Sequence, residues 1–176
     1  YINGKYAGYS EGSRLQAEFD ITDFVQKGKN KIKAKVRKWC SGSYLEDQDC
    51  FRYNGIFRDV YILQRPQKHI FDVDIRTDGN TVIVEFVGDA VCTLYDAADN
   101  EISSTKAKNK AALKAANPIK WNAEKPYLYR LQIECEGEII NFDIGFVSYG
   151  INERAAFTVN GTEVKLKGIN HHDTHP

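Results

Sequence analysis

Short runs of alternating apolar and polar residues recur along most of the chain, which is the pattern of β-strands that bury one face. Between residues 30 and 39, Ile32, Ala34 and Val36 alternate with lysine and arginine. We therefore predict a strand there, with its basic side chains in water. Further runs predict strands at 70–75, 81–87, 91–95, 128–135 and 138–144, with turns at 78–80, 88–89 and 136–137. Short strands at this spacing are typical of a small antiparallel sandwich, so the predicted fold class is all-β.

Two Asn-Gly pairs predict tight hairpins. Asn3-Gly4 and Asn160-Gly161 each lie between apolar residues, and the central residues of such two-residue turns need a positive φ that Asn and Gly tolerate. The first hairpin begins almost at residue 1. Because an isolated hairpin is at best marginally stable in water, we expect further strands upstream in a longer protein.

Charge and composition exclude several classes of protein. The 176 residues include 24 basic and 24 acidic side chains, and this balance argues against a partner such as nucleic acid or an acidic membrane. No apolar stretch reaches the roughly 18 to 20 residues needed to cross a bilayer, and no secretion signal opens the chain. The four cysteines have no C-x-x-C spacing, so we expect them to be unpaired and predict a cytoplasmic protein.

One acidic cluster offers a possible acid/base pair. Glu46, Asp47 and Asp49 lie close in sequence, and glycosidases use two carboxylates about 5 to 9 Å apart. The alternative is structural, because carboxylates in a loop that also carries Arg52 and Arg58 commonly form ion pairs that hold the loop. We favour the structural interpretation.

A histidine-rich segment, His171-His172-Asp173-Thr174-His175, ends the sequence. Imidazoles beside a carboxylate could bind a metal ion. However, His171 and His175 face the same side only on a helix, and the segment lacks the Glu of H-E-x-x-H. A solvated tail and a polar rim at the end of a barrel strand remain as alternatives, and we predict no metal site from these residues alone.

Four segments in order resemble the β-galactosidases of glycoside hydrolase family 2. The most specific is the run G-S-Y-L-E-D-Q-D at 42–49 followed by G-I-F-R-D-V at 55–60. The others are N-G-K at 3–5 with G-Y-S at 8–10, W-N-A-E-K-P-Y-L-Y at 121–129, and Asn160-Gly161 leading to G-I-N-H-H-D-T-H-P at 168–176. The resemblance thus covers essentially the whole chain.

The resemblance implies three regions. Residues 1–66 look like the C-terminal part of a jelly-roll sugar-binding domain, 67–152 like an immunoglobulin-like β-sandwich, and 153–176 like the start of a (β/α)₈ catalytic barrel. It also bears on residues 105–116, where lysine and alanine favour a helix by local propensity. In this family the Asn117-Pro118 run that follows leads into a sandwich strand, so we expect a loop or a strand.

The family's retaining mechanism uses one Glu as acid and a second as nucleophile, and the resemblance implies that both lie beyond Pro176. No catalytic residue is therefore expected here, and the isolated chain should hydrolyse nothing. Two residues can inherit a role in substrate binding. His172 matches a histidine that contacts the galactosyl ring, and it follows an alternation of Val164 and Leu166 that predicts a strand. Ser41 stands where members of the family carry an Asp that helps to hold sodium and the galactose 6-hydroxyl.

The resemblance implies a homo-oligomeric parent protein that acts on a β-galactoside substrate such as lactose. It implies Mg²⁺ and Na⁺ as cofactors of that parent and none within this chain. Because Ser41 brings no charge, it weakens the expectation of sodium. Two alternatives remain: a free-standing carbohydrate- or protein-binding β-sandwich module, and a sibling β-glucuronidase or β-mannosidase.

Overall fold

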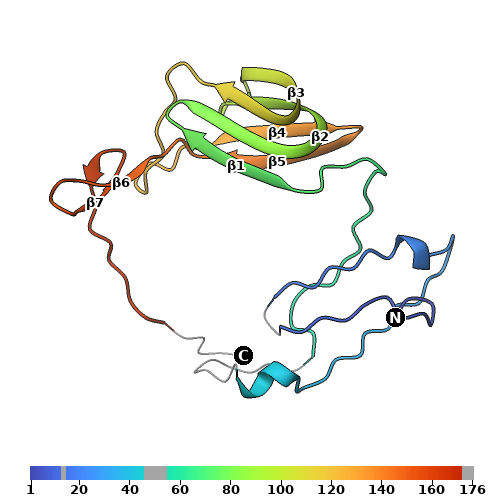
Figure 1. Ribbon diagram of the computed structural model, residues 1–176. Coiled ribbons are helices and arrows are strands. Elements are labelled where there is room, and N and C mark those ends of the chain that lie inside the picture. Colours follow the sequence, from blue (N-terminus) through green and yellow to red (C-terminus); the bar gives the residue numbers. More distant parts are fainter. Residues whose placement is uncertain (13–14, 46–54, 172–176) are drawn as a thin grey trace. The chain divides into compact units, whose positions relative to one another are not determined.

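The computed structural model describes residues 1–12, 15–45 and 55–171, and the chain divides into two compact units. Unit 1 comprises Tyr1–Ile62 and Gly168–Pro176, and unit 2 comprises Leu63–Lys167. The described residues contain strands and two short 3₁₀ helices but no α-helix, which confirms the all-β class (Figure 1). None of these helices is long and apolar enough to span a membrane. The domain limits expected at residues 66 and 152 stay predictions.

All eight strands among the described residues belong to unit 2. They are β1 (Val73–Asp78), β2 (Thr81–Tyr95), β3 (Glu101–Lys114), β4 (Tyr129–Cys135), β5 (Glu138–Ile144), β6 (Tyr149–Ile151), β7 (Phe157–Val159) and β8 (Thr162–Glu163). The first five form one antiparallel sheet in which β2 pairs with β1, β3 and β4, and β4 pairs with β5. Strands β6, β7 and β8 form a second, smaller sheet.

The main sheet curls because β2 and β3 bend together at their middle. The first half of β2 pairs with β1 and the end of β3, whereas its second half pairs with β4 and the start of β3. The register shifts between Glu85 and Asp89, where Gly88 has a φ of 103° and donates its N–H to Asn109 Oδ1 at 2.9 Å. The turn predicted at 88–89 is therefore wrong: the site is a bulge, which bends a continuous strand without ending it.

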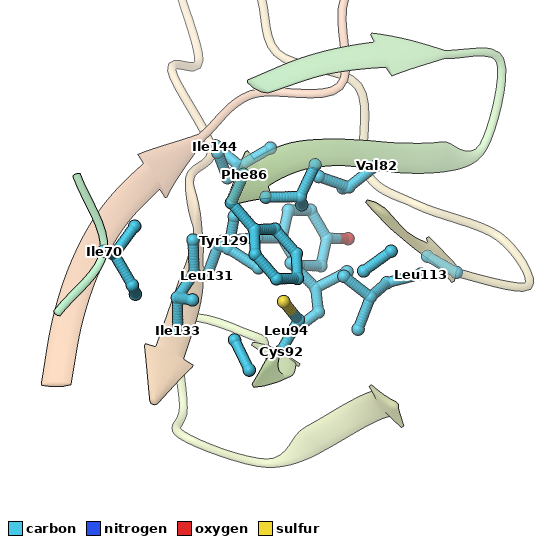
Figure 2. Close-up of a cluster of buried hydrophobic side chains, with 14 of the residues drawn as sticks. Ile70, Val82, Phe86, Cys92, Leu94, Leu113, Tyr129, Leu131, Ile133 and Ile144 are labelled. Carbon is cyan, nitrogen blue, oxygen red and sulfur yellow. The ribbon is translucent and has the colours of Figure 1, made fainter. Parts of the chain in front are cut away.

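The curl encloses one hydrophobic core (Figure 2). Every strand of the main sheet contributes side chains at alternate positions, and many have no exposed surface. The fully buried residues include Val82, Val84, Cys92, Leu94, Leu113, Leu131, Ile133 and Phe146. Each of these side chains contributes roughly 1.5–3 kcal/mol by leaving water, which makes this core the main source of stability in unit 2.

Residues 101–114 form a strand despite their helix propensity. Along β3, exposed lysines alternate with Ala107, Ala111 and Leu113, which face the interior. Because the strand pairs with β2 along most of its length, period-two burial and ladder hydrogen bonds outweigh a propensity of a few tenths of a kcal/mol per residue. The expectation of a loop or strand is thus confirmed as a strand.

The described part of unit 1 contains extended segments that pair only through isolated β-bridges. The hairpin at Asn3-Gly4 is confirmed: φ is 51° and 83°, and Ile2 and Lys5 exchange two backbone hydrogen bonds of 2.9 Å. The strand predicted at 30–39 is wrong, because only Ile32 forms a bridge, with Ile2. Val36 is 52% exposed, so the alternation is present but no partner strand among the described residues covers it.

The second Asn-Gly hairpin is also confirmed, with φ of 50° at Asn160 and 80° at Gly161 between β7 and β8. Its return strand is shorter than predicted. Strand β8 ends at Glu163, so Val164 and Leu166 do not lie in a strand. An alternation of only two apolar residues is a weak indication of a strand. Val164 and Leu166 are not buried against a sheet and stay exposed.

A partly buried ion pair connects the start of unit 2 to β5. The Arg65 guanidinium donates to both carboxylate oxygens of Glu138, at 2.7 and 2.8 Å, and to the Ile70 carbonyl at 2.6 Å. Glu138 also accepts the Ile70 N–H at 3.0 Å. These four hydrogen bonds hold the chain that leads into β1 against β5.

Candidate functional site

The site expected at Ser41 lies on a well-defined turn. Ser41 opens the 3₁₀ helix η2 (Ser41–Tyr44). The Cys40 N–H donates to Ser43 Oγ at 3.0 Å, and the Ser43 N–H donates to the Cys40 carbonyl at 3.1 Å. Ser43 is buried, whereas Ser41 is exposed. Reciprocal bonds of this kind rigidify a turn, so the Ser41 hydroxyl is held at the surface on a fixed backbone.

A carboxylate 30 residues earlier in the chain contacts this hydroxyl. Ser41 Oγ donates to Glu11 Oε2 at 2.9 Å, and the Tyr9 hydroxyl donates to Glu11 Oε1. The backbone just before Tyr9 passes against an aromatic ring, because a Cβ added at Gly8 would lie 2.3 Å from Phe19. Glycine at position 8 thus permits the close approach that positions the Tyr9–Glu11 segment.

These hydrogen bonds set the charges of the cluster. The hydroxyl of Tyr9, and after it that of Ser41, stabilises the carboxylate and lowers the pKa of Glu11. The bond to Glu11 in turn raises the pKa of Tyr9. At neutral pH the cluster therefore presents one negative charge on Glu11, with a neutral phenol and a neutral alcohol bound to it.

Exposed aromatic rings lie on the same turn as Ser41. Trp39 and Tyr44 stack with their centroids 6.5 Å apart and an interplanar angle of 16°. The Lys38 ammonium lies 5.4 Å from the Trp39 centroid. Trp39 is 54% exposed and Tyr44 is 83% exposed. The same short segment thus carries apolar rings, which suit the C–H groups of a polar ring compound, and the Ser41 hydroxyl, which suits its O–H groups.

The other predicted residues divide into two groups. His172, Glu46, Asp47 and Asp49 lie outside the described residues, and so do Asp173, His175, Arg52 and Cys50. Within the described ranges, His171 is exposed, and no group of three or more His, Cys, Asp or Glu side chains could hold a metal ion. Cys40, Cys92 and Cys135 are free there.

Sequence reasoning missed Tyr9 and Glu11. One signal was available, because residues two apart on an extended segment share a face, so a phenol and a carboxylate at 9 and 11 can meet. Their contact with Ser41 had no such signal. It depends on how two segments about 30 residues apart approach each other, which the alternation pattern does not specify.

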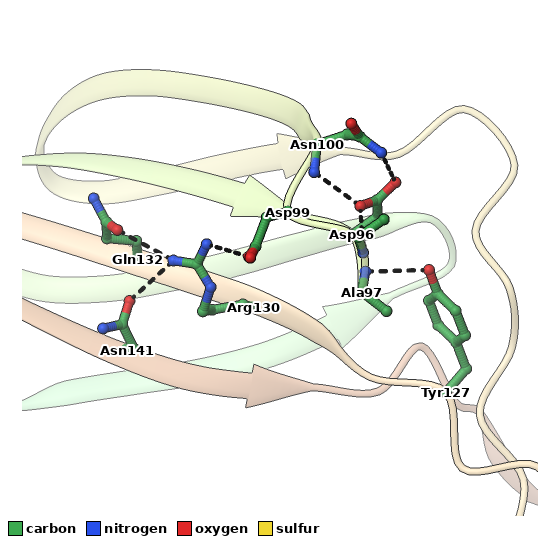
Figure 3. A network of polar contacts seen from close by, with 9 residues as sticks. Asp96, Ala97, Asp99, Asn100, Tyr127, Arg130, Gln132 and Asn141 are labelled. Atoms are coloured by element: carbon green, nitrogen blue, oxygen red, sulfur yellow. Dashed lines mark hydrogen bonds and ion pairs between the residues drawn. The ribbon is translucent and has the colours of Figure 1, made fainter.

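A second polar cluster lies in unit 2, where the loop between β2 and β3 meets β4 (Figure 3). Arg130 donates to Asp99 at 2.6 Å and lies 4.3 Å from the Tyr95 ring centroid. Asp96 accepts the backbone and side-chain N–H groups of Asn100, each at 2.9 Å, which lowers its pKa. Since these groups bind one another, we interpret the cluster as a structural support for the loop.

Comparison with known proteins places both units in one family. Residues 1–66 match the model "Glycosyl hydrolases family 2, sugar binding domain", and residues 61–146 match "Glycosyl hydrolases family 2". A β-galactosidase from Staphylococcus xylosus is 36% identical over 193 residues, covering 100% of this chain and 19% of the relative. A β-galactosidase from Priestia megaterium is 34% identical over 206 residues, covering 98% of this chain and 20% of the relative.

The fold has a solved counterpart. The structure of a β-D-glucuronidase from Dictyoglomus thermophilum superposes with a TM-score of 0.72 at 24% identity, over 96% of this chain and 34% of that chain. That likeness concerns the fold alone, an immunoglobulin-like β-sandwich preceded by part of a jelly roll. The chain spans about a fifth of the length of the curated relatives named above. Two models of one family match this chain, and relatives from that family align along its whole length. The chain therefore belongs to glycoside hydrolase family 2.

Proposed function

We propose that this chain is a non-catalytic portion of a retaining β-galactosidase, which removes terminal β-D-galactose from β-galactosides such as lactose. The observation that carries the proposal is the 36% identity to a β-galactosidase across 100% of the chain. The exposed turn that carries Ser41 supports it from the structure, because a hydroxyl and stacked aromatic rings on one short segment suit the edge of a sugar pocket.

In this proposal the chemistry takes place elsewhere in the parent protein. Retaining hydrolysis needs one carboxylic acid to protonate the leaving oxygen and a second carboxylate, about 5 Å away, to form the glycosyl-enzyme. Residues of this chain bind and orient the sugar. Ser41 hydrogen-bonds a hydroxyl of the ring, and His172 hydrogen-bonds the same sugar through its imidazole, more strongly as charge develops on the ring.

Metal cofactors stay a prediction for the parent protein. Among the described residues, the carboxylate nearest Ser41 is Glu11, and it already accepts two hydroxyl donors. One carboxylate and two hydroxyls form a sparse ligand set for Mg²⁺ or Na⁺. Neither ion is therefore part of the sugar binding that we propose for this chain.

Assays of the parent protein with nitrophenyl β-galactoside test the proposal. We expect turnover by the parent, none by the isolated 176 residues, and a drop in kcat/KM of about 10²-fold in a His172→Ala variant, as when one oriented donor to a transition state is lost. His69→Ala is the matched control, since His69 lies in unit 2, where its Nδ1 is 2.9 Å from the Pro66 carbonyl, and it has no role in this proposal; it should leave kcat/KM unchanged. Turnover by the isolated chain, or a parent inactive on β-galactosides but active on β-glucuronides, would contradict the proposal.

A further inference from the structure

The hydrogen bonds around Glu11 leave its partners able only to accept. A serine or tyrosine hydroxyl carries a single donor hydrogen. Both Ser41 and Tyr9 place that hydrogen on the Glu11 carboxylate. Their oxygen lone pairs stay available, and the carboxylate has acceptor capacity of its own. The exposed oxygen atoms of this cluster can therefore only accept hydrogen bonds from a ligand.

We propose that Glu11 is a specificity residue that makes this face select neutral sugars, through their donating hydroxyl groups, over uronic acids. The inference rests on the proposed function, in which Ser41 contacts the sugar, and it adds which sugars that contact admits. A hydroxymethyl group can donate to Ser41. A carboxylate in its place has no hydrogen to donate, and it meets both oxygen lone pairs and the charge of Glu11.

Glu11 acts on the sugar through Ser41 and through its charge, so it is a positioning residue. The lowered pKa of Glu11 supports this role, since the carboxylate is ionised at neutral pH. Two cations on the neighbouring segment, Arg37 and Lys38, reduce the repulsion that the Glu11 charge exerts on an anionic ligand. Arg37 is near enough to Tyr9 to influence its pKa, and Lys38 lies over the Trp39 ring. Ser41 and Tyr9 hydrogen-bond Glu11 directly, whereas Lys38 contacts the Trp39 ring and Arg37 acts on Tyr9.

Titration calorimetry on the parent protein with D-galactose and D-galacturonate tests the inference. These sugars differ in whether carbon 6 carries a hydroxyl or a carboxylate. We expect the wild type to bind galactose more tightly, and Glu11→Gln to narrow the ratio of dissociation constants roughly threefold, as for an exposed charge pair. High salt should narrow it as well. Glu18→Gln is the matched control, because Glu18 is also exposed in unit 1 and accepts a hydrogen bond, from Gln16 at 2.7 Å.

A second variant, Ser41→Ala, tests the inference even if Glu11→Gln does not fold. Ser41→Ala removes the acceptor but keeps the Glu11 charge, so galactose binding should weaken while galacturonate binding changes little. If Ser41→Ala weakens galacturonate at least as much, Ser41 donates to the ligand and the inference is wrong. A wild type that prefers galacturonate, or Glu11→Gln leaving the ratio unchanged, also overturns it. A parent that binds galactose with this preference but does not hydrolyse β-galactosides would refute only the proposed function.

Discussion

The two units carry the same alternation of apolar and polar residues but convert it into structure very differently. In unit 2 fifteen residues form one buried cluster, and most have under 5% of their surface exposed. In the described part of unit 1, Ile2 is the one buried apolar residue, at 4%, while Ile32 and Val36 are about half exposed. Alternation therefore specifies which face of a strand is apolar, and a partner strand is required before that face is buried.

The prediction with the largest expected effect compares the truncation of one apolar side chain in each unit. Leu131 is fully buried in β4, so Leu131→Ala should lower the free energy of unfolding of unit 2 by about 2–5 kcal/mol. Val36→Ala removes a side chain that is 52% exposed and should cost no more than ~0.5 kcal/mol. Urea unfolding followed by fluorescence separates the units, because Trp39 lies in unit 1 and Trp121 in unit 2.

Single-tryptophan backgrounds provide the control. A Trp39→Phe chain reports unit 2 through Trp121, and the loss from Leu131→Ala should appear there in full. If Val36→Ala costs as much as Leu131→Ala, residues 30–39 bury their apolar face in solution. The contrast between the units would then be wrong, and the strand predicted from the alternation would be right.

A smaller effect is expected at the contact that ties the start of unit 2 to its sheet. Glu138→Ala leaves Arg65 and the Ile70 N–H without their acceptor and should cost about 1–3 kcal/mol. The bond to Arg65 lowers the pKa of Glu138, so the folded state binds a proton less readily than the unfolded state. This contribution is complete above the ordinary glutamate pKa of about 4.3 and is lost as the pH falls through the lowered value.

Urea midpoints of unit 2 between pH 7 and pH 3 measure that contribution. The wild type should lose stability below about pH 4.3 more steeply than Glu138→Gln, which has no group to protonate at this position. Glu124→Gln is the control, since Glu124 contacts Asn122 only through its backbone N–H. Parallel pH profiles for the wild type and Glu138→Gln would contradict the role of the Arg65 contact.

The sequence predicted the features that depend on local pattern. Both Asn-Gly hairpins form, because positive φ is a property of the turn residues themselves. The strand at 101–114 was ambiguous, since its lysines and alanines suit a helix until β2 lies beside them. At the candidate site Ser41 was found through the family resemblance. Glu11 was not, because its contact with Ser41 depends on the approach of two distant segments.

The bend in unit 2 gives a still smaller expected effect. Gly88 has a φ of 103°, and a Cβ there would meet no atom within 4 Å. Gly88→Ala should therefore cost about 1–2 kcal/mol through backbone strain alone. Gly168 lies in unit 1, has no positive φ and has equal space, so Gly168→Ala should leave the urea midpoint of unit 2 unchanged. Urea midpoints of the two variants measure the difference, and equal values would show that the bulge does not need glycine.

The smallest perturbation labels the thiols without changing the sequence. Cys92 lies in the core of unit 2, where burial raises its pKa to about 11, whereas Cys40 in unit 1 is partly exposed. Because the thiolate is the reactive form, native Cys92 should react with iodoacetamide at least ~100-fold more slowly at pH 8. Peptide mapping by mass spectrometry gives both rates in one sample, and the partly exposed Cys135 serves as a control within unit 2. If Cys92 reacts as fast as Cys135, the core of unit 2 opens readily in solution and the contrast with unit 1 is lost.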